Sequence, residues 1–131
     1  MSTPQPPVKI TTCPLPARGR LFWGPIISGV VMYASARPGL IAPGSWLYEI
    51  ALAGSPTAFD AAWWVQKGLF YFLFGAHAIE TVAFAAGPLR EHGVPLFGLA
   101  WFQWMIGCFV GGIFATKHFE NVVRAKERGR Q

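Results

Sequence analysis

The chain has 131 residues, of which 53% are hydrophobic and 13% charged, and its formal net charge is +5. This length allows one domain, and a soluble domain of this size has too small an interior for so many apolar side chains, so most water-soluble folds are excluded. A bilayer solvates apolar side chains directly. The basic residues lie mostly outside the apolar stretches, which indicates determinants of membrane topology and not a nucleic-acid surface.

Composition divides the chain into three parts. Residues 1–20 are rich in proline and carry basic residues, which predicts a disordered basic tail. Residues 21–116 form the transmembrane domain, and residues 117–131 form a basic C-terminal tail. The two cysteines, Cys13 and Cys108, would lie at different depths, so a disulfide between them is not expected.

The first span is predicted over residues 21–36, an uncharged run of about 24 Å that crosses a bilayer if its flanks contribute. Ala34-Ser35-Ala36 also has the form of a signal-peptide cleavage site, so a cleaved signal is the alternative to a retained anchor. Residues 40–54 are short, apolar and interrupted by proline and glycine, which favours an interfacial or re-entrant segment.

The second and third spans are predicted over residues 68–89 and 93–116, joined by a tight polar turn and packed as an antiparallel hairpin. The predicted fold class is therefore an all-α integral membrane protein with three transmembrane helices. Basic residues are more numerous on the side that would carry the C-terminus, so the positive-inside rule favours a cytosolic or matrix-side C-terminus.

His77 and Glu80 are the ionisable pair inside the second span, and a spacing of three residues puts them on one helix face. Counting from the turn places Gln103 at the depth of Glu80, with Trp101 and Trp104 beside it as indole donors. These five residues are the candidate binding site. The pair is either a polar clamp between helices, an acid/base or ligand-binding pair, or part of an ion or proton path.

His77 and Glu80 are the candidates for catalysis, although no catalytic role is assigned to them. One imidazole and one carboxylate make an incomplete metal site, so neither a metal nor a cofactor is expected. Gly107, Gly111 and Ala115 form a ridge of small residues on which another helix can pack closely. The partner is either the second span of the same chain or another membrane protein.

Several short motifs carry a family resemblance: Leu21-Phe22-Trp23, His77 with Glu80, His92-Gly93, and Trp101 with Gln103 and Gly107. Together they resemble the transmembrane protein 254 family of small multi-span membrane proteins, whose biochemical function is uncharacterised. The resemblance implies three spans and a His/Glu pair in the middle of the membrane.

The predicted function is that of a non-enzymatic accessory or scaffold subunit that packs against other membrane proteins. The alternative is a lipid- or sterol-binding protein, including an isomerase-like enzyme that uses His77 and Glu80. The expected partners are membrane lipids and other membrane proteins or copies of the chain, without nucleic acid. The expected location is the endoplasmic reticulum or another intracellular membrane.

Overall fold

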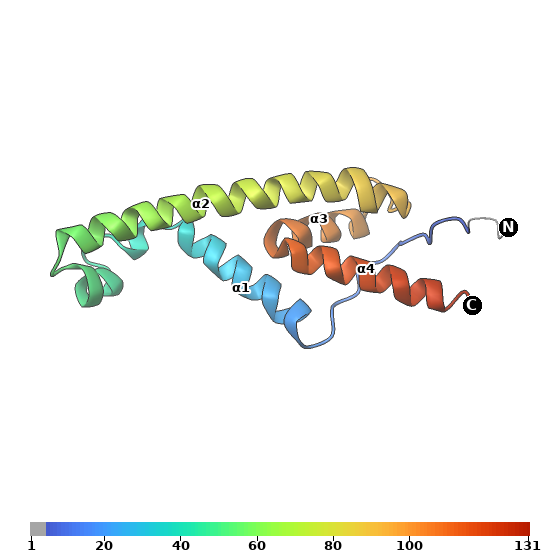
Figure 1. Ribbon diagram of the computed structural model, residues 1–131, viewed down its shortest axis with the longest axis horizontal. Helices are drawn as coiled ribbons and strands as arrows, with labels where there is room; N and C mark the ends of the chain where they lie inside the picture. The colour runs from blue at the N-terminus through green and yellow to red at the C-terminus, as the bar shows by residue number, and fades with distance from the viewer. Residues whose placement is uncertain (1–4) are drawn as a thin grey trace.

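A computed structural model describes residues 5–131, and this part of the chain confirms the all-α prediction, with 72% helix and no strand. Figure 1 shows that the longest helix, α2, runs along one side of the molecule; α3 and α4 lie along its second half, and the end of α1 meets its first half. The C-terminus lies at the same end as the described residues of the N-terminal segment. The elements are α1 (Arg20–Ser35), η1 (Pro38–Leu40), η2 (Tyr48–Leu52), α2 (Pro56–Phe84), η3 (Ala85–Leu89), α3 (Leu99–Gly111) and α4 (Ile113–Arg128).

The long helix α2 starts at a residue pair that favours a helix N-terminus. The Ser55 hydroxyl accepts a hydrogen bond from the Ala58 N–H at 3.2 Å, and Pro56 occupies the first turn. With η3 the helix continues to Leu89, and its 34 residues make about 51 Å. Its most apolar stretch has a mean hydropathy of 1.5 and is only 11% buried. Within residues 5–131, this is the one helix both long and apolar enough to cross a membrane.

The predicted helix over 93–116 is a hairpin of two helices instead. Residues 93–98 form an irregular turn, α3 ends at Gly111, and Gly112 takes a φ of +52°, a left-handed conformation that glycine adopts most easily. The chain then reverses into α4, so that the Phe119 ring packs against Trp104 at 5.0 Å between centroids. The antiparallel packing predicted for the second and third apolar stretches is confirmed, since Phe84 contacts Trp104 and Phe74 contacts Phe109.

Glycines on α1 allow its backbone to approach the α3–α4 hairpin closely. A Cβ at Gly24 would lie 2.6 Å from the Phe114 ring, and one at Gly29 would lie 2.9 Å from Val110. The other end of α1 is held by Gln66 of α2, whose amide donates to the carbonyls of Ala34 and Arg37 at 2.9 and 2.8 Å. The last carbonyls of a helix have no partner within it, so Gln66 acts as a cap for α1.

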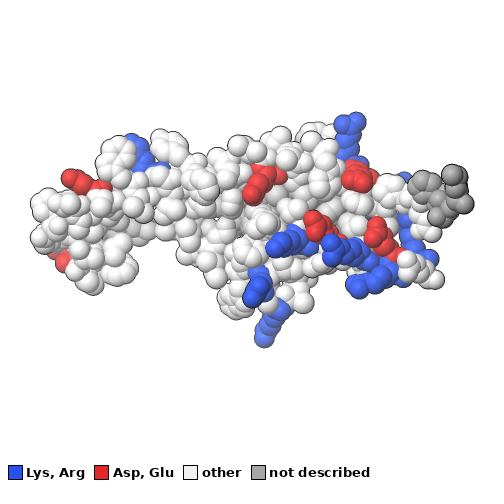
Figure 2. Space-filling model, viewed as in Figure 1, with Lys and Arg blue, Asp and Glu red and all other residues white. Residues whose placement is uncertain are grey.

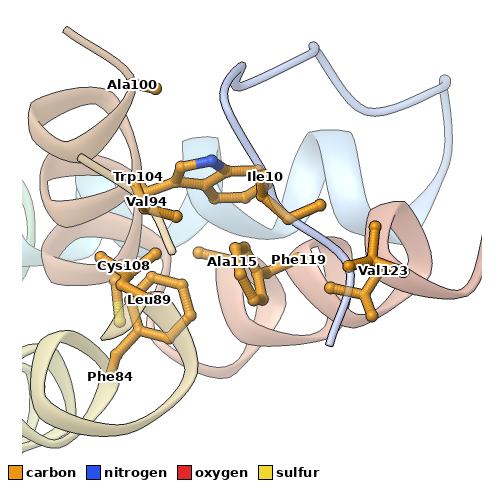
Figure 3. Close-up of a cluster of buried hydrophobic side chains, with 11 residues drawn as sticks. Ile10, Phe84, Leu89, Val94, Ala100, Trp104, Cys108, Ala115, Phe119 and Val123 are labelled. Atoms are coloured by element: carbon orange, nitrogen blue, oxygen red, sulfur yellow. The ribbon is translucent and has the colours of Figure 1, made fainter. Parts of the chain in front are cut away.

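The N-terminal segment, residues 5–19, is an extended strap packed on the hairpin, which differs from the disordered tail that its prolines predict. Val8 and Ile10 are 4% and 0% exposed and belong to the hydrophobic core. Figure 3 shows Ile10 within this core. The Ile10 N–H donates to the His92 carbonyl at 2.9 Å. Five carbonyls of the strap accept hydrogen bonds from the side chains of His92, Trp104, His118, Lys126 and Arg130.

The segment between α1 and α2 has little regular structure. It contains only the short helices η1 and η2, and Trp46 and Ile50 are 69% and 78% exposed. This region lies at the end of the molecule opposite to the C-terminus (Figure 1). The interfacial or re-entrant placement of residues 40–54 stays a prediction.

Candidate functional site

His77 of α2 holds the end of α3. Its Nδ1 lies 2.6 Å from the Phe109 carbonyl oxygen, and because a carbonyl only accepts, Nδ1 carries the proton. In an unbroken α-helix that carbonyl would accept from the N–H four residues later, at Ile113. The break at Gly112 removes this partner, so the imidazole replaces it. The histidine is thereby a polar clamp between α2 and α3.

Glu80 meets His77 at the same break. A Cβ at Gly112 would lie 2.8 Å from Glu80 Oε2 and 3.2 Å from His77 Nε2, so both side chains crowd the glycine. The structure thus brings together the two residues that the sequence singled out. Glu80 is nevertheless exposed at the surface of the bundle, while His77 is half-buried, so the carboxyl group is not enclosed between helices.

Gln103 does not face Glu80 as the depth count predicts. The neighbouring Trp104 packs against Phe84, one helical turn beyond Glu80, and Gln103 lies exposed on another side of α3. The physical reason is that residues 93–98 form an irregular turn, which shifts the register of α3 relative to that of a helix starting at residue 93.

The two predicted indole donors also lie away from the His77/Glu80 pair. The Trp101 ring packs on Phe97 and Phe102 at 5.3 and 5.1 Å between centroids. The Trp104 side chain is 1% exposed, and its Nε1 donates to the Thr12 carbonyl of the strap at 3.2 Å. The five candidate binding residues therefore occupy three places and do not form one site.

The small-residue ridge is used mainly within the chain. A Cβ at Gly111 would lie 3.0 Å from Pro25 of α1, and Ala115 is buried in the core. The helix packed on this part of the ridge is α1, whereas the expected partners were the second span of the same chain or another membrane protein. At Gly107 an added Cβ would meet no atom of residues 5–131 within 4 Å, so this position stays open.

An apolar groove of about 450 Å³ lies beside Gly107, and we call it the strap groove. It is lined by residues 13–16 of the strap and by faces of α1, α3 and α4, including Gln103 and Trp104. Burial raises the pKa of the Cys13 thiol at its edge, because the thiolate loses hydration. Sequence reasoning missed this groove, since one wall is a segment predicted to be disordered.

The hydrophobic positions Val8 and Ile10 are the sequence signal for the strap. They alternate with polar residues in a proline-rich stretch, which fits an extended chain with one apolar face. Among residues 5–131, no group of three or more His, Cys, Asp or Glu side chains is placed to hold a metal ion. Cys13 and Cys108 are both free thiols.

Comparisons with known family models, with curated proteins and with solved structures give no match to this chain. The resemblance to the transmembrane protein 254 family therefore stays a prediction, carried by its short motifs.

Proposed function

We propose that this chain is an integral membrane protein that serves as a non-enzymatic accessory or scaffold subunit. The observation that carries the membrane assignment is the exposed apolar surface of the helices. Ile27 of α1, Phe72 of α2 and Ile106 of α3 are 60%, 70% and 63% exposed, and many large apolar neighbours are exposed with them. Soluble monomers rarely expose continuous apolar patches of this extent, whereas lipid chains solvate them.

Cation–π pairs at one end of this surface support a membrane boundary. Lys67 lies over the Trp63 ring at 4.4 Å, and Arg37 lies over the Tyr33 ring at 4.9 Å. Gln66 joins the two helices at this level by its bonds to α1. Aromatic rings and long basic side chains collect where the bilayer meets water.

We propose a topology in which α2 crosses the bilayer, α1 crosses it with a contribution from its flanking residues, and the α3–α4 hairpin enters from the side of the termini. The 13 residues of α3 make about 20 Å, less than a hydrocarbon core of about 30 Å, and the chain reverses directly after it. This arrangement revises the three complete crossings expected from the apolar runs. The outer face of α4 carries many of the charged side chains in Figure 2, which fits a position at the water boundary.

The polar side chains of the bundle support a structural role. His77 and Gln66 are bonded to backbone carbonyls of neighbouring helices, so their hydrogen-bonding groups stabilise the fold. On the outer face of α2, Gly68 and Gly75 leave room in which a partner helix could approach, since a Cβ at either position would meet no described atom within 4 Å.

Site-specific photocrosslinking in native membranes tests the accessory role. A benzophenone amino acid replaces Phe72 or Ile79, which are 70% and 73% exposed on α2, and Phe84, which is 3% exposed, serves as the internal control. We expect adducts with the mass of another membrane protein at the first two positions and none at the third. Adducts with lipids alone at both exposed positions would contradict the role.

The alternative function, lipid or sterol binding, is favoured by one specific observation, the strap groove. Gln103 and Trp104 line it, whereas His77 lies against the Phe109 carbonyl and Glu80 lies at the hairpin tip. A lipid-binding role would therefore depend on the groove more than on the His/Glu pair. Replacing Glu80 by Gln distinguishes an acid/base enzyme from a lipid-binding groove. The enzyme would lose turnover, whereas the groove would retain its lipid.

A further inference from the structure

We propose that the strap groove binds one acyl chain of an anionic phospholipid, whose phosphate contacts Arg18 and Arg20. The inference rests on the proposed membrane insertion and deepens the lipid-binding alternative, because it names the class of lipid and its orientation. It does not depend on whether the outer face of α2 packs against a partner.

The groove has the properties of a site for an apolar chain. Its volume of about 450 Å³ lies in the range of ligand pockets, which is about 300–1,000 Å³. Leu15, Phe22, Ile26 and Ile106 contribute apolar side chains to its lining. Glycine at position 107 keeps the space open, since a larger side chain there would project into it.

A second hollow of about 480 Å³ adjoins the groove and supplies the charge, and we call it the basic mouth. Leu21 and His118 line both hollows, so the two are neighbours that share part of their walls. Arg18 and Arg20 line the basic mouth, and among the described residues none with an acidic side chain lines either hollow. Guanidinium groups bind phosphate oxygens in a bidentate manner, which makes a phosphodiester the complementary headgroup.

The position of the groove in the fold agrees with lateral entry from lipid. It lies between α1 and α3, and Ile26 and Ile106 at its rim are 44% and 63% exposed on the apolar surface. Arg18 lies just before α1 and Arg20 is its first residue, so both lie at the end of α1 that borders α4, the helix with most of the basic residues of the C-terminal part. The leaflet on the basic side of a membrane protein is the one rich in anionic lipids.

An anionic phospholipid fits these features better than a protein helix does. A partner helix could fill the apolar groove, but it would not supply the anionic group that two neighbouring arginines can bind. The lipid satisfies both, since its chain replaces apolar contacts and its phosphate pairs with the arginines.

Native mass spectrometry of the full chain in a non-ionic detergent tests the headgroup. Dioleoyl phosphatidylglycerol is added, or dioleoyl phosphatidylcholine, which has the same chains without net charge. We expect preferential binding of phosphatidylglycerol. The double variant Arg18→Gln/Arg20→Gln should weaken it about 30-fold, because one basic residue near a lipid surface contributes about fivefold. The control Arg124→Gln/Arg128→Gln removes the same charge from α4 and should leave binding nearly unchanged.

A second pair of variants tests the groove. Gly107→Leu places a side chain in it without a clash inside the protein and should weaken phosphatidylglycerol binding about tenfold, as expected when an added side chain overfills a site. Gly75→Leu makes the same change on the outer face of α2, where space is also open, and should leave binding unchanged.

Three results would overturn the proposal. Equal binding of the two lipids would remove the headgroup assignment, and full binding by Gly107→Leu would remove the groove. Recovery of a second copy of the chain or another protein in place of lipid, lost in Gly107→Leu, would assign the groove to a helix. The membrane fraction of the wild-type chain after alkaline extraction is measured in parallel, so that a failure of membrane insertion is recognised separately.

Discussion

Side chains from distant positions satisfy backbone carbonyls at the ends of several segments of this protein. His77 serves the Phe109 carbonyl, Gln66 serves Ala34, and Trp104 serves Thr12. In a water-free environment an unpaired carbonyl is costly, and only a donor from the protein can replace the missing helix bond. At the residue scale, His77, one half of the pair that resembles a reaction centre in the sequence, therefore stabilises a helix end.

Replacing His77 by Leu should lower the free energy of unfolding by about 1–3 kcal/mol, because the Phe109 carbonyl loses its donor. His77→Gln retains an N–H donor and should recover much of the loss. Thermal unfolding in detergent, followed by tryptophan fluorescence, measures both variants. Equal stability of the Leu variant and the wild type would show that the 2.6 Å contact does not stabilise the hairpin.

Gly112→Ala should also destabilise the protein, by about 1–3 kcal/mol, because a residue with a Cβ is strained at a φ of +52° and would crowd Glu80 and His77. Gly107→Ala is the matched control in the same hairpin. That position is inside a helix with open space, so alanine should be stabilising by about 0.5–1 kcal/mol. Thermal unfolding in detergent measures both variants. A stabilising effect of Gly112→Ala would contradict the break between α3 and α4 at Gly112.

At the scale of elements, the strap and the α3–α4 hairpin hold one another in place. Ile10 of the strap lies in the same core as Trp104 of α3 and Phe119 of α4 (Figure 3). The strap has no helix or sheet of its own, so its extended backbone depends on side-chain donors of the hairpin. Its order is therefore coupled to that of α3 and α4.

The Cys13 thiol reports on this coupling. Ile10→Ala removes a fully buried side chain, which costs about 2–5 kcal/mol and should release the strap. Burial raises the pKa of Cys13 in the packed strap, so less thiolate is present near pH 8, and release should lower the pKa and speed alkylation. Maleimide labelling, read by peptide mass to separate Cys13 from Cys108, measures the rate. Leu15→Ala, at an 87% exposed position, should change it much less.

The apolar runs predicted helices more reliably than they predicted helix ends. The first span, 21–36, nearly coincides with α1, whereas α2 begins at Pro56 and not at residue 68. Asp60 and Lys67 argue against lipid burial, but they do not prevent a helix, and the Ser55-Pro56 start signal lies before them. The break at Gly112 could not be predicted because glycine is frequent in membrane helices and the run around it is uncharged.

The candidate site was predictable only where it is local in sequence. His77 and Glu80 are three residues apart on one helix and do lie together at Gly112. Gln103 depended on a count across an irregular turn and was misplaced, and the strap groove needs residues about 90 positions apart, such as Cys13 and Gln103. Short motifs give no information on such contacts.

At the scale of the whole molecule, exposure of apolar side chains distinguishes a membrane protein from a soluble one. Phe72 and Ile50 are 70% and 78% exposed, so a water-soluble protein would tolerate arginine equally at both. In the proposed topology Phe72 faces lipid and Ile50 lies outside the bilayer core. Phe72→Arg should then disfavour insertion by about 2.5–3.5 kcal/mol, and Ile50→Arg should have little effect. The membrane-inserted fraction after cell-free translation with microsomes measures both, and equal insertion would contradict the topology.

The distribution of basic residues makes a further prediction about sidedness. With α1 and α2 as the crossings and the α3–α4 hairpin returning to its side of entry, both termini lie on one side of the membrane. Of the eleven Lys and Arg residues, Arg37 and Lys67 then lie on the opposite side, and the other nine share the side of the termini. These nine are Lys9, Arg18, Arg20, Arg90, Lys117, Arg124, Lys126, Arg128 and Arg130. This asymmetry is far stronger than the division that three complete crossings would give.

The positive-inside rule therefore predicts that both termini face the cytosol or matrix, and the two topologies differ at the N-terminus. Three complete crossings would put the termini on opposite sides. Epitope tags at each end, probed with protease in sealed vesicles, measure this directly. We expect both tags to be digested without detergent, whereas a tag inserted after Gly54, between α1 and α2, should be protected. Digestion of only one terminal tag would contradict the topology with two crossings, because only an odd number of spans places the two ends of a chain on opposite sides.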